Sequence, residues 1–560
     1  MNPSFHIIDF VIVGIYAILL VGVGLWVSRT KKGHTKTAED YFLASKALPW
    51  WAIGSSLIAA NISAEQFIGM SGSGFAGGLA IASYEFMAAL TLIIVGKFFL
   101  PIFIKQGIYT IPEFVEKRFS TNLKTILAVF WIALFVFVNL TSVLFLGGKA
   151  IDTIVGVGDG SMIVPAIIAL AIFAAAYSLY GGLSAVAWTD VIQVALLVIG
   201  GIITTLIALH YVTPDGGILN GISHIADAAS DKFDMVLSRD NKEFNNLPGI
   251  YVLIGGLWVA NLYYWGFNQY IIQRTLAAKS LTEAQRGIAF AAFLKMLIPF
   301  IVVIPGIVAW VMYSEDLYGA RSAFEIAGST ALNNDNAYPW LISTFIPVVP
   351  KAFGFFFIAP TFIPVGVKGL VLAALAAAIV SSLASMLNST STIFTMDIYK
   401  PYINREASQT KLVNVGRLTA GIALIIAVCL APLLGGIDQM FQYIQEYTGL
   451  VSPGILAVFL MGLFWKKATN KGGYWGVLCS IPIALIFKLL PLEMPFMDQM
   501  FYATLLTIVV IFMVSLSSNP ADDDPKAIKL TADMFKTDKV FNICAYIICI
   551  LLVVIYTAFF

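Results

Sequence analysis

Apolar residues occur along this chain in blocks of about 20 or more, and each block is long enough to cross a hydrocarbon core of about 30 Å as a helix. Short polar segments separate the blocks. The pattern predicts an all-α polytopic membrane protein with 14 transmembrane helices. Their approximate ranges are 8–28, 48–80, 82–104, 124–148, 162–180, 184–210, 249–273, 285–313, 366–396, 412–434, 439–465, 473–490, 497–517 and 540–560.

Composition agrees with this pattern. Of the 560 residues, 59% are hydrophobic and 12% are charged, whereas a soluble protein carries roughly 25% charged residues. All four cysteines fall inside predicted spans, which argues against a disulfide framework. The first block, Ile8–Val27, is too long for the apolar core of a signal peptide, so we expect it to be retained as a span.

Two classes of partner are not expected. No stripe of basic residues with interleaved aromatics suggests nucleic-acid binding. The chain has no G-x-x-x-x-G-K-S/T motif, so ATP-driven transport by this chain is not expected either.

Lysine and arginine concentrate in alternate loops, which predicts the orientation in the lipid bilayer. Of the 33 basic residues, 23 fall on one side, which is predicted to be cytoplasmic, and the acidic loops 211–248 and 314–350 fall on the other. The expected location is the cell (inner) membrane, with both termini outside. The proline-rich segment 344–369 does not read as a span and is expected to be external or re-entrant.

Polar residues cluster inside several predicted spans. The stretch Ser56–Gly69 holds Asn61, Ser63, Glu65 and Gln66 within one long apolar block. Other spans contribute further polar residues, namely Tyr84, Glu85, Asn261, Tyr263, Tyr264, Lys295, Gln442, Gln445 and Glu446. Ionisable side chains at such depth usually face a protein interior or a wet cavity and suggest a functional site. Hydrogen bonding between helices is the structural alternative.

The inventory suits a neutral polyhydroxylated ligand, because each hydroxyl both donates and accepts hydrogen bonds. Glu85 offers an acceptor, the amides offer both kinds of group, and Lys295 offers a donor. The aromatic run Tyr263–Trp265 is suited to covering a sugar ring, although such a run is also typical of packing or an interfacial belt.

A second cluster suggests a cation site. Ala378, Ser381 and Ser382 are spaced i, i+3, i+4 and therefore share one helical face. Two hydroxyls and a carbonyl would need further carbonyl oxygens from a neighbouring helix that has unwound, and the block interrupted at Asn61–Ser63 is a candidate. Close packing of small residues explains the same face without a cation.

These stretches resemble the sodium/solute symporter family, and particularly its bacterial sugar carriers, nearly from end to end. The matching runs include "SLIAANISAEQFIGMSGSG", "GGLWVANLYYWGFNQYIIQRTLAAKS" and "AALAAAIVSSLASMLNSTSTIFTMDIYK". The resemblance implies a LeuT-like core of two inverted five-helix repeats, within 48–210 and 249–465. The first helix of each repeat would be discontinuous, with an extra N-terminal helix at 8–28 and peripheral helices in 473–560.

The resemblance also implies Na⁺-coupled symport of a monosaccharide, galactose or glucose, with Na⁺ as the co-transported ion. The implied sugar site is Asn61, Gln66, Glu85, Asn261, Tyr264, Lys295 and Gln445. The implied gates are Met70, Tyr84 and Phe441 on the outside and Tyr264 on the inside. The implied sodium residues are Ala59, Ile62, Ala378, Ser381 and Ser382, with Asp190 near the sodium exit path.

Two positions depart from the family pattern. Ala88 stands where a serine of the sugar site is expected, and Phe86 stands where a tryptophan is expected. The sequence therefore does not determine which sugar is preferred. Alternative solutes are myo-inositol, sialic acid and proline. A membrane sensor is a rival from another class, and an enzyme using Glu65 and Glu85 is a weaker one. Oligomeric state, Na⁺ stoichiometry and the role of Glu65 do not follow from the sequence.

Overall fold

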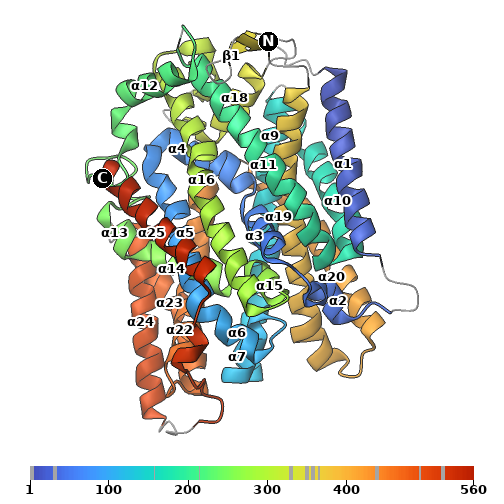
Figure 1. The fold of residues 1–560 in the computed structure, drawn as a ribbon. Helices are drawn as coiled ribbons and strands as arrows, with labels where there is room; N and C mark the ends of the chain where they lie inside the picture. Colours follow the sequence, from blue (N-terminus) through green and yellow to red (C-terminus); the bar gives the residue numbers. More distant parts are fainter. Residues whose placement is uncertain are drawn as a thin grey trace.

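The computed structural model describes residues 6–560 apart from ten short internal gaps. These gaps are 30–34, 157, 214, 327–331, 347–351, 355–359, 363–365, 436–439, 491–493 and 519–523. The chain forms a bundle in which long helices run roughly parallel from the top to the bottom of Figure 1.

The longer helices correspond to the apolar blocks. They are α1 (Ile7–Val27), α3 (Trp50–Asn61), α5 (Ser83–Ile94), α8 (Thr121–Ala133), α9 (Thr141–Val155), α10 (Ile163–Gly181), α11 (Leu183–Tyr211), α14 (Gly256–Phe267), α16 (Leu281–Ser314), α19 (Val367–Ile393), α20 (Gln409–Leu430), α22 (Ser452–Phe464), α23 (Asn470–Leu489), α24 (Phe496–Ser517) and α25 (Lys539–Ala558).

Shorter elements extend or connect them. The short α-helices are α2 (Ala38–Phe42), α4 (Ser71–Gly77), α6 (Leu100–Gln106), α7 (Ile111–Arg118), α12 (Ile218–Ala228), α13 (Ile250–Ile254), α15 (Gln269–Leu276), α17 (Ala320–Phe324), α18 (Ala337–Phe345) and α21 (Met440–Thr448). The 3₁₀ and π segments are η1 (Ala44–Lys46), η2 (Glu65–Met70), η3 (Gly78–Ala82), η4 (Val95–Phe99), η5 (Leu134–Leu140), η6 (Ser230–Phe233), η7 (Leu317–Gly319), η8 (Asn334–Asn336), η9 (Phe394–Ile403), η10 (Ala431–Leu434) and η11 (Ala532–Phe535).

The count of 14 transmembrane helices is not confirmed. The described part of the chain has 11 helices that are long and apolar enough to cross a membrane. The total is 12 when Met440–Thr448 and Ser452–Phe464, which meet at a 48° bend, are taken as one broken span. Two predicted spans, 48–80 and 249–273, do not add to this total, because each is divided into shorter helices. The second half of 48–80 is continuous with the counted helix Glu65–Gln106.

Breaks interrupt both of those spans. Helix α3 ends at Asn61, the backbone at Ile62 is extended, and helical structure resumes in η2. Similarly, α14 ends at Phe267, Asn268 is extended, and α15 follows. The predicted discontinuity of these two spans is thus present, and it gives each of them free backbone groups inside the bundle.

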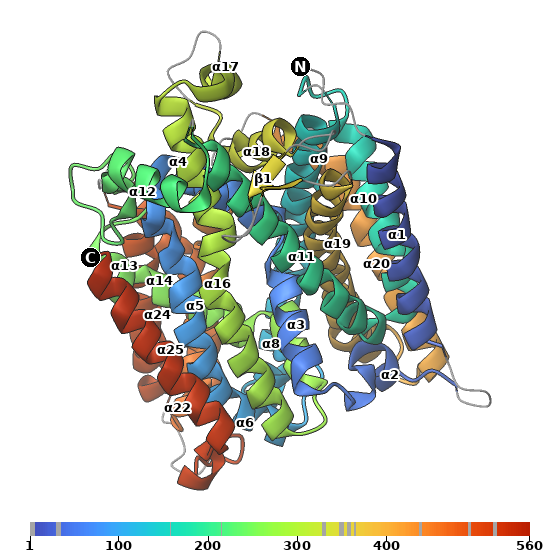
Figure 2. The same ribbon diagram turned by 45° about the horizontal axis from the view of Figure 1, so that its top comes forward.

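Helix α16 lies at the centre of the bundle and packs on α3, α4, α5 and α11 (Figure 2). Glycines bring the backbones close together. A Cβ on Gly306 would lie 2.2 Å from the carbonyl oxygen of Ser71, and one on Gly54 would lie 2.6 Å from that of Gly287. The close approach of α16 to α3 and α4 therefore depends on small residues, as in other membrane helix pairs.

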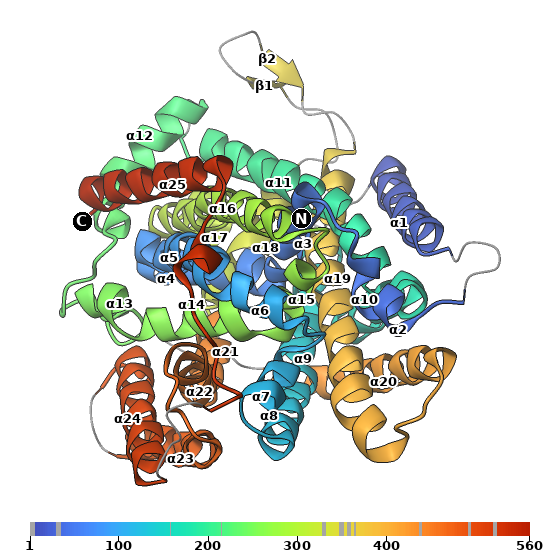
Figure 3. The ribbon, with the colours of Figure 1, turned by 60° about the horizontal axis from the view of Figure 1, so that its bottom comes forward.

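Helices α22, α23 and α24 form a group on the side of the bundle away from α1 and α10 (Figure 3). Half of the proline-rich segment 344–369 lies outside the described residues. Its described part includes an antiparallel pairing of β1 (Ala352–Gly354) with β2 (Pro360–Phe362). This hairpin was not expected from the helical pattern.

Candidate functional site

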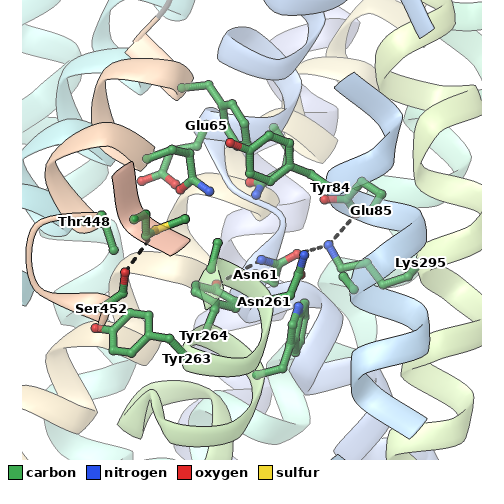
Figure 4. A pocket seen from close by; sticks show the side chains of 18 residues that line it. Asn61, Glu65, Tyr84, Glu85, Asn261, Tyr263, Tyr264, Lys295, Thr448 and Ser452 are labelled. Atoms are coloured by element: carbon green, nitrogen blue, oxygen red, sulfur yellow. Dashed lines mark hydrogen bonds and ion pairs between the residues drawn. The ribbon is translucent and has the colours of Figure 1, made fainter. Parts of the chain in front are cut away.

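A cavity of about 60 Å³ lies beside the break between α3 and η2. One water needs about 10–15 Å³ on this measure, so the cavity holds several. Residues of eight helical elements line it, and Figure 4 labels ten of these residues. The lining residues are Asn61, Glu65, Gln66, Tyr84, Glu85, Ala88, Ala260, Asn261, Tyr263, Tyr264, Trp265, Lys295, Phe441, Gln445, Thr448, Gly449, Ser452 and Met500.

All seven residues predicted for the sugar site line this cavity. Of the predicted gate residues, Tyr84, Phe441 and Tyr264 also line it, whereas Met70 is fully buried and is not part of the lining. The structure thus brings together groups that are far apart in the sequence.

Lys295 of α16 joins two walls of the cavity. Its ammonium donates to the carboxylate of Glu85 on α5 and to the side-chain oxygen of Asn61 at the end of α3. It also lies 5.1 Å from the centre of the Trp265 ring. Because Lys295 is almost completely buried, this pairing is what makes its charge tolerable in the bundle.

Tyr264 closes one side of the cavity. Its hydroxyl accepts from Nδ2 of Asn61 at 2.9 Å and from the hydroxyl of Tyr270 at 2.6 Å. The Tyr270 ring packs edge-on against it, with centroids 5.7 Å apart. Tyr264 is therefore held between the broken helix α3 and the second broken span.

The break after α3 is capped by its own polar residues. The Ser63 amide donates to Oε1 of Gln66 at 2.9 Å, and the Ser63 hydroxyl accepts from the amide of Glu65 at 3.0 Å. These bonds satisfy backbone groups that a continuous helix would have paired internally. The polar cluster in Ser56–Gly69 thus has a structural role in addition to any role in binding.

An aromatic contact closes the opposite side of the cavity. The rings of Tyr84 and Phe441 meet edge to face with centroids 5.1 Å apart. Helix α21, which carries Phe441, lies so close to η2 that a Cβ on Gly69 would be 2.8 Å from Cβ of Phe441. This contact closes the cavity between η2, α5 and α21.

Four of the five predicted sodium residues belong to two helices that are in contact, α3 and α19. The hydroxyl of Ser382 donates to the carbonyls of Ala60 at 3.0 Å and Ala59 at 3.4 Å. Because the Ser63 amide is engaged by Gln66, the carbonyl of Ala59 is available to α19. Ala378 and Ser381 of α19 are also fully buried. So is Ile62, which lies in the extended segment directly after α3.

Asp190 of α11 lies next to this group. Its carboxylate accepts from Ser381 at 2.6 Å and from Ser56 at 2.5 Å, and it lies 3.6 Å from the guanidinium of Arg274. Both charged side chains are fully buried. The predicted exit-path carboxylate is therefore an ion-paired neighbour of the predicted sodium residues.

Sequence reasoning missed part of the lining, namely Ala260, Thr448, Gly449, Ser452 and Met500. The run "EYTGLVSPG" contains Gly449 and Pro453, which are signals of a helix break. That signal would have indicated that Thr448 and Ser452 flank a bend. Met500 lies on α24 and carries no sequence signal, because only the packing of that peripheral helix brings it to the cavity.

Comparisons with known proteins are consistent across the chain. Residues 41–480 match the model of the Sodium:solute symporter family. The chain is 63% identical to the sodium/glucose cotransporter of Vibrio parahaemolyticus, covering 99% of this chain and 98% of the relative. It is 31% identical to the sodium/myo-inositol cotransporter of Canis lupus familiaris, covering 87% and 68% of the two chains.

A solved structure shares the fold. The substrate-bound, outward-open structure of a Na⁺-coupled sialic acid symporter superimposes with a TM-score of 0.77 at 24% identity. The match covers 93% of this chain and the whole of the other. At this level of identity the likeness concerns the arrangement of helices alone.

Proposed function

Because the chain belongs to the sodium:solute symporter family, we propose that it carries a monosaccharide, galactose or glucose, into the cell together with Na⁺. The observation that carries this proposal is the contact of a polar cavity with a broken helix that also touches the Ser382 hydroxyl. One short segment, 59–66, thereby joins a site for a polyol to a site for a cation.

We further propose that the bundle contains two inverted five-helix repeats, within 48–210 and 249–465. The two broken spans support this arrangement, since each would begin a repeat. Discontinuous helices near the middle of a membrane transporter place half-helix ends and free carbonyls at the substrate and ion. The lysine-rich ends of the bundle would face the cytoplasm, with both termini outside.

In this proposal the sugar occupies the cavity beside Trp265, where Lys295 and Glu85 act as an ion pair that can meet neighbouring hydroxyls. Gln66, Asn261 and Gln445 complete the polar lining. Tyr264 separates the sugar from the cytoplasm, and Tyr84 with Phe441 separates it from the outside. Met70 supports this outer closure from its buried position.

Na⁺ would bind between α3 and α19 with oxygens from Ala59, Ile62, Ala378, Ser381 and Ser382, since a hard cation prefers oxygen ligands. Its binding would hold the unwound end of α3 against α19. That position fixes Asn61, and Asn61 in turn holds Tyr264 and Lys295. Asp190 would receive the ion as it leaves toward the cytoplasm.

The test is counterflow in proteoliposomes. Vesicles loaded with unlabelled galactose should take up labelled galactose transiently when Na⁺ is present on both sides. Unlabelled galactose and glucose should compete with labelled galactose for uptake, and myo-inositol and proline should compete with it more weakly. A membrane sensor would bind the sugar without flux, so binding with no counterflow would contradict the proposal.

A further inference from the structure

Among the described residues that line the cavity, Glu65 is the one carboxylate without an evident partner. It begins η2, and its side chain lines the cavity on the side away from Tyr263 and Tyr264 (Figure 4). Oxygen Oε1 is buried and has no hydrogen-bond partner among the described residues. The backbone amide of Glu65 caps the break through Ser63, but its carboxylate takes no part in that cap.

The other acidic side chains nearby are paired. Glu85 receives the ammonium of Lys295, and Asp190 lies against Arg274. Among the described lining residues Lys295 is the only lysine or arginine, and Glu85 and Asn61 already engage it. The cavity therefore contains an unpaired hydrogen-bond acceptor. Its described lining offers no free cation that could pair with a carboxylate on a substrate.

An unpartnered buried acceptor costs stability unless a ligand satisfies it. Because Glu65 is a lining residue, a donor for its carboxylate can come from the contents of the cavity. A sugar hydroxyl is a donor of the right kind, whereas a carboxylated sugar would bring a second anion next to the first. Sites built to hydrogen-bond a particular group discriminate strongly against ligands that leave that group unpaired.

We propose that Glu65 is a specificity-determining residue: its carboxylate accepts a hydrogen bond from a hydroxyl of the bound solute and makes the cavity select neutral polyols over carboxylated sugars. This inference rests on the proposed function and narrows its alternatives. It favours hexoses and myo-inositol, and it excludes sialic acid as the physiological solute.

The test compares Glu65→Gln with wild type in proteoliposomes, using Na⁺-driven uptake of labelled galactose with galacturonate as the competitor. Uptake of labelled galactose by the wild type should be half-inhibited by unlabelled galactose at a concentration at least tenfold lower than that of galacturonate. In Glu65→Gln the half-saturating galactose concentration should rise about fivefold to tenfold, because a charged acceptor forms a stronger hydrogen bond than an amide. The preference over galacturonate should shrink to less than threefold.

Two further variants separate binding from folding. Glu65→Asp keeps the charge and should keep the discrimination even if galactose affinity falls. Glu446→Gln removes a carboxylate from α21 that lies outside the cavity and should leave both quantities unchanged. Retained discrimination in Glu65→Asp together with its loss in Glu65→Gln identifies the charge as the cause.

Three results would overturn the inference. One is wild-type affinity and discrimination in Glu65→Gln. Another is an altered Na⁺ half-saturation with galactose affinity intact, which would assign Glu65 to the cation. A third is loss of discrimination in Glu65→Asp as well. If wild type itself moves no sugar, the proposed function fails first and this inference fails with it.

Discussion

The partner that each polar side chain already has determines what it can offer a substrate. Gln66 uses its oxygen on the amide of Ser63, so its Nε2 group is what remains to donate. Asn261 uses Nδ2 on the carbonyl of Leu257 at 3.1 Å, so its oxygen remains to accept. These two amides therefore present opposite polarity to the cavity, as a hydroxyl that both donates and accepts requires.

Ala88 lines the cavity without a polar group, which allows a gain-of-function test. Ala88→Ser should lower the half-saturating galactose concentration about threefold to tenfold, because one added hydrogen bond contributes about 0.5–1.5 kcal/mol. Equilibrium binding of labelled galactose in detergent measures this directly. Ala89→Ser, next on the same helix but away from the lining, is the control; equal effects of both changes would argue against a sugar contact at Ala88.

Ser382 tests the cation site in the same way. Removing its hydroxyl in Ser382→Ala should raise the Na⁺ concentration for half-maximal uptake about tenfold or more, because a hard cation loses one oxygen ligand. The Na⁺ dependence of galactose uptake measures this effect. Ser391→Ala removes another buried hydroxyl of α19, one that has no hydrogen-bond partner in the described part of the chain, and should leave Na⁺ dependence unchanged. Wild-type Na⁺ dependence in Ser382→Ala would show that the assignment is wrong.

At the scale of the helices, the position of each break controls the site. The end of α3 at Asn61 puts that side chain beside Lys295 and Tyr264, and a continuous helix would have paired the same backbone groups internally. The bend between α21 and α22 likewise places Thr448 and Ser452 on the lining. The cavity thus lies beside the break after α3 and the bend between α21 and α22.

Glycine contacts hold α16 close to the broken span, and this predicts a packing effect. Gly306→Ala would force a Cβ against the carbonyl of Ser71, so it should destabilise the protein by about 1–3 kcal/mol and reduce uptake. The midpoint of thermal unfolding in detergent should fall. Gly421→Ala on α20, where nothing lies within 4 Å of the added Cβ, should be tolerated. Equal midpoints for the two variants would contradict this account of the α4–α16 contact.

Many of the helices could be predicted from the sequence, and physical reasons explain which features were predicted and which were not. Apolar blocks located the spans, because hydrocarbon excludes polar backbone unless it is helical. Polar residues inside a block, such as Asn61 and Ser63, indicated a break. The count of 14 transmembrane helices is not confirmed, since a block such as 249–273 is divided at Asn268, a residue whose type does not indicate a break.

The site was predictable where its residues stand out against an apolar background. Glu85, Lys295 and Gln445 do so, and each lines the cavity. Met500 is apolar on an apolar helix, so only tertiary packing reveals it. Glu65 stood out in the sequence as well, but its role depends on the structural finding that its Oε1 has no hydrogen-bond partner among the residues described.

At the scale of the whole molecule, the candidate sugar site and the candidate sodium site share the segment 59–66. This segment lies between the lysine-rich end and the acidic end of the bundle. Helices α12 and α18 lie at the upper end of Figure 1, and α7 lies at the lower end. The cavity lies between these ends, enclosed by aromatic contacts on both sides. An arrangement of this kind permits access from one side at a time.

Binding of sugar and Na⁺ should therefore be coupled reciprocally. If Na⁺ tightens galactose binding by some factor, galactose must tighten Na⁺ binding by the same factor. Calorimetric titration of each ligand with and without the other should give a common factor of about fivefold or more, corresponding to roughly 1 kcal/mol of coupling. Independent binding of the two ligands would contradict the role given to segment 59–66.

Gradient-driven accumulation in proteoliposomes is the most direct test of the central claim. With external Na⁺ and an inside-negative potential, labelled galactose should accumulate above its external concentration. A potential of about 100 mV contributes roughly 2.3 kcal/mol per charge, or about fiftyfold for one Na⁺ per sugar. Accumulation should vanish when choline replaces Na⁺. Galactose that only equilibrates, or that accumulates equally well in choline, would contradict Na⁺-coupled sugar symport by this protein.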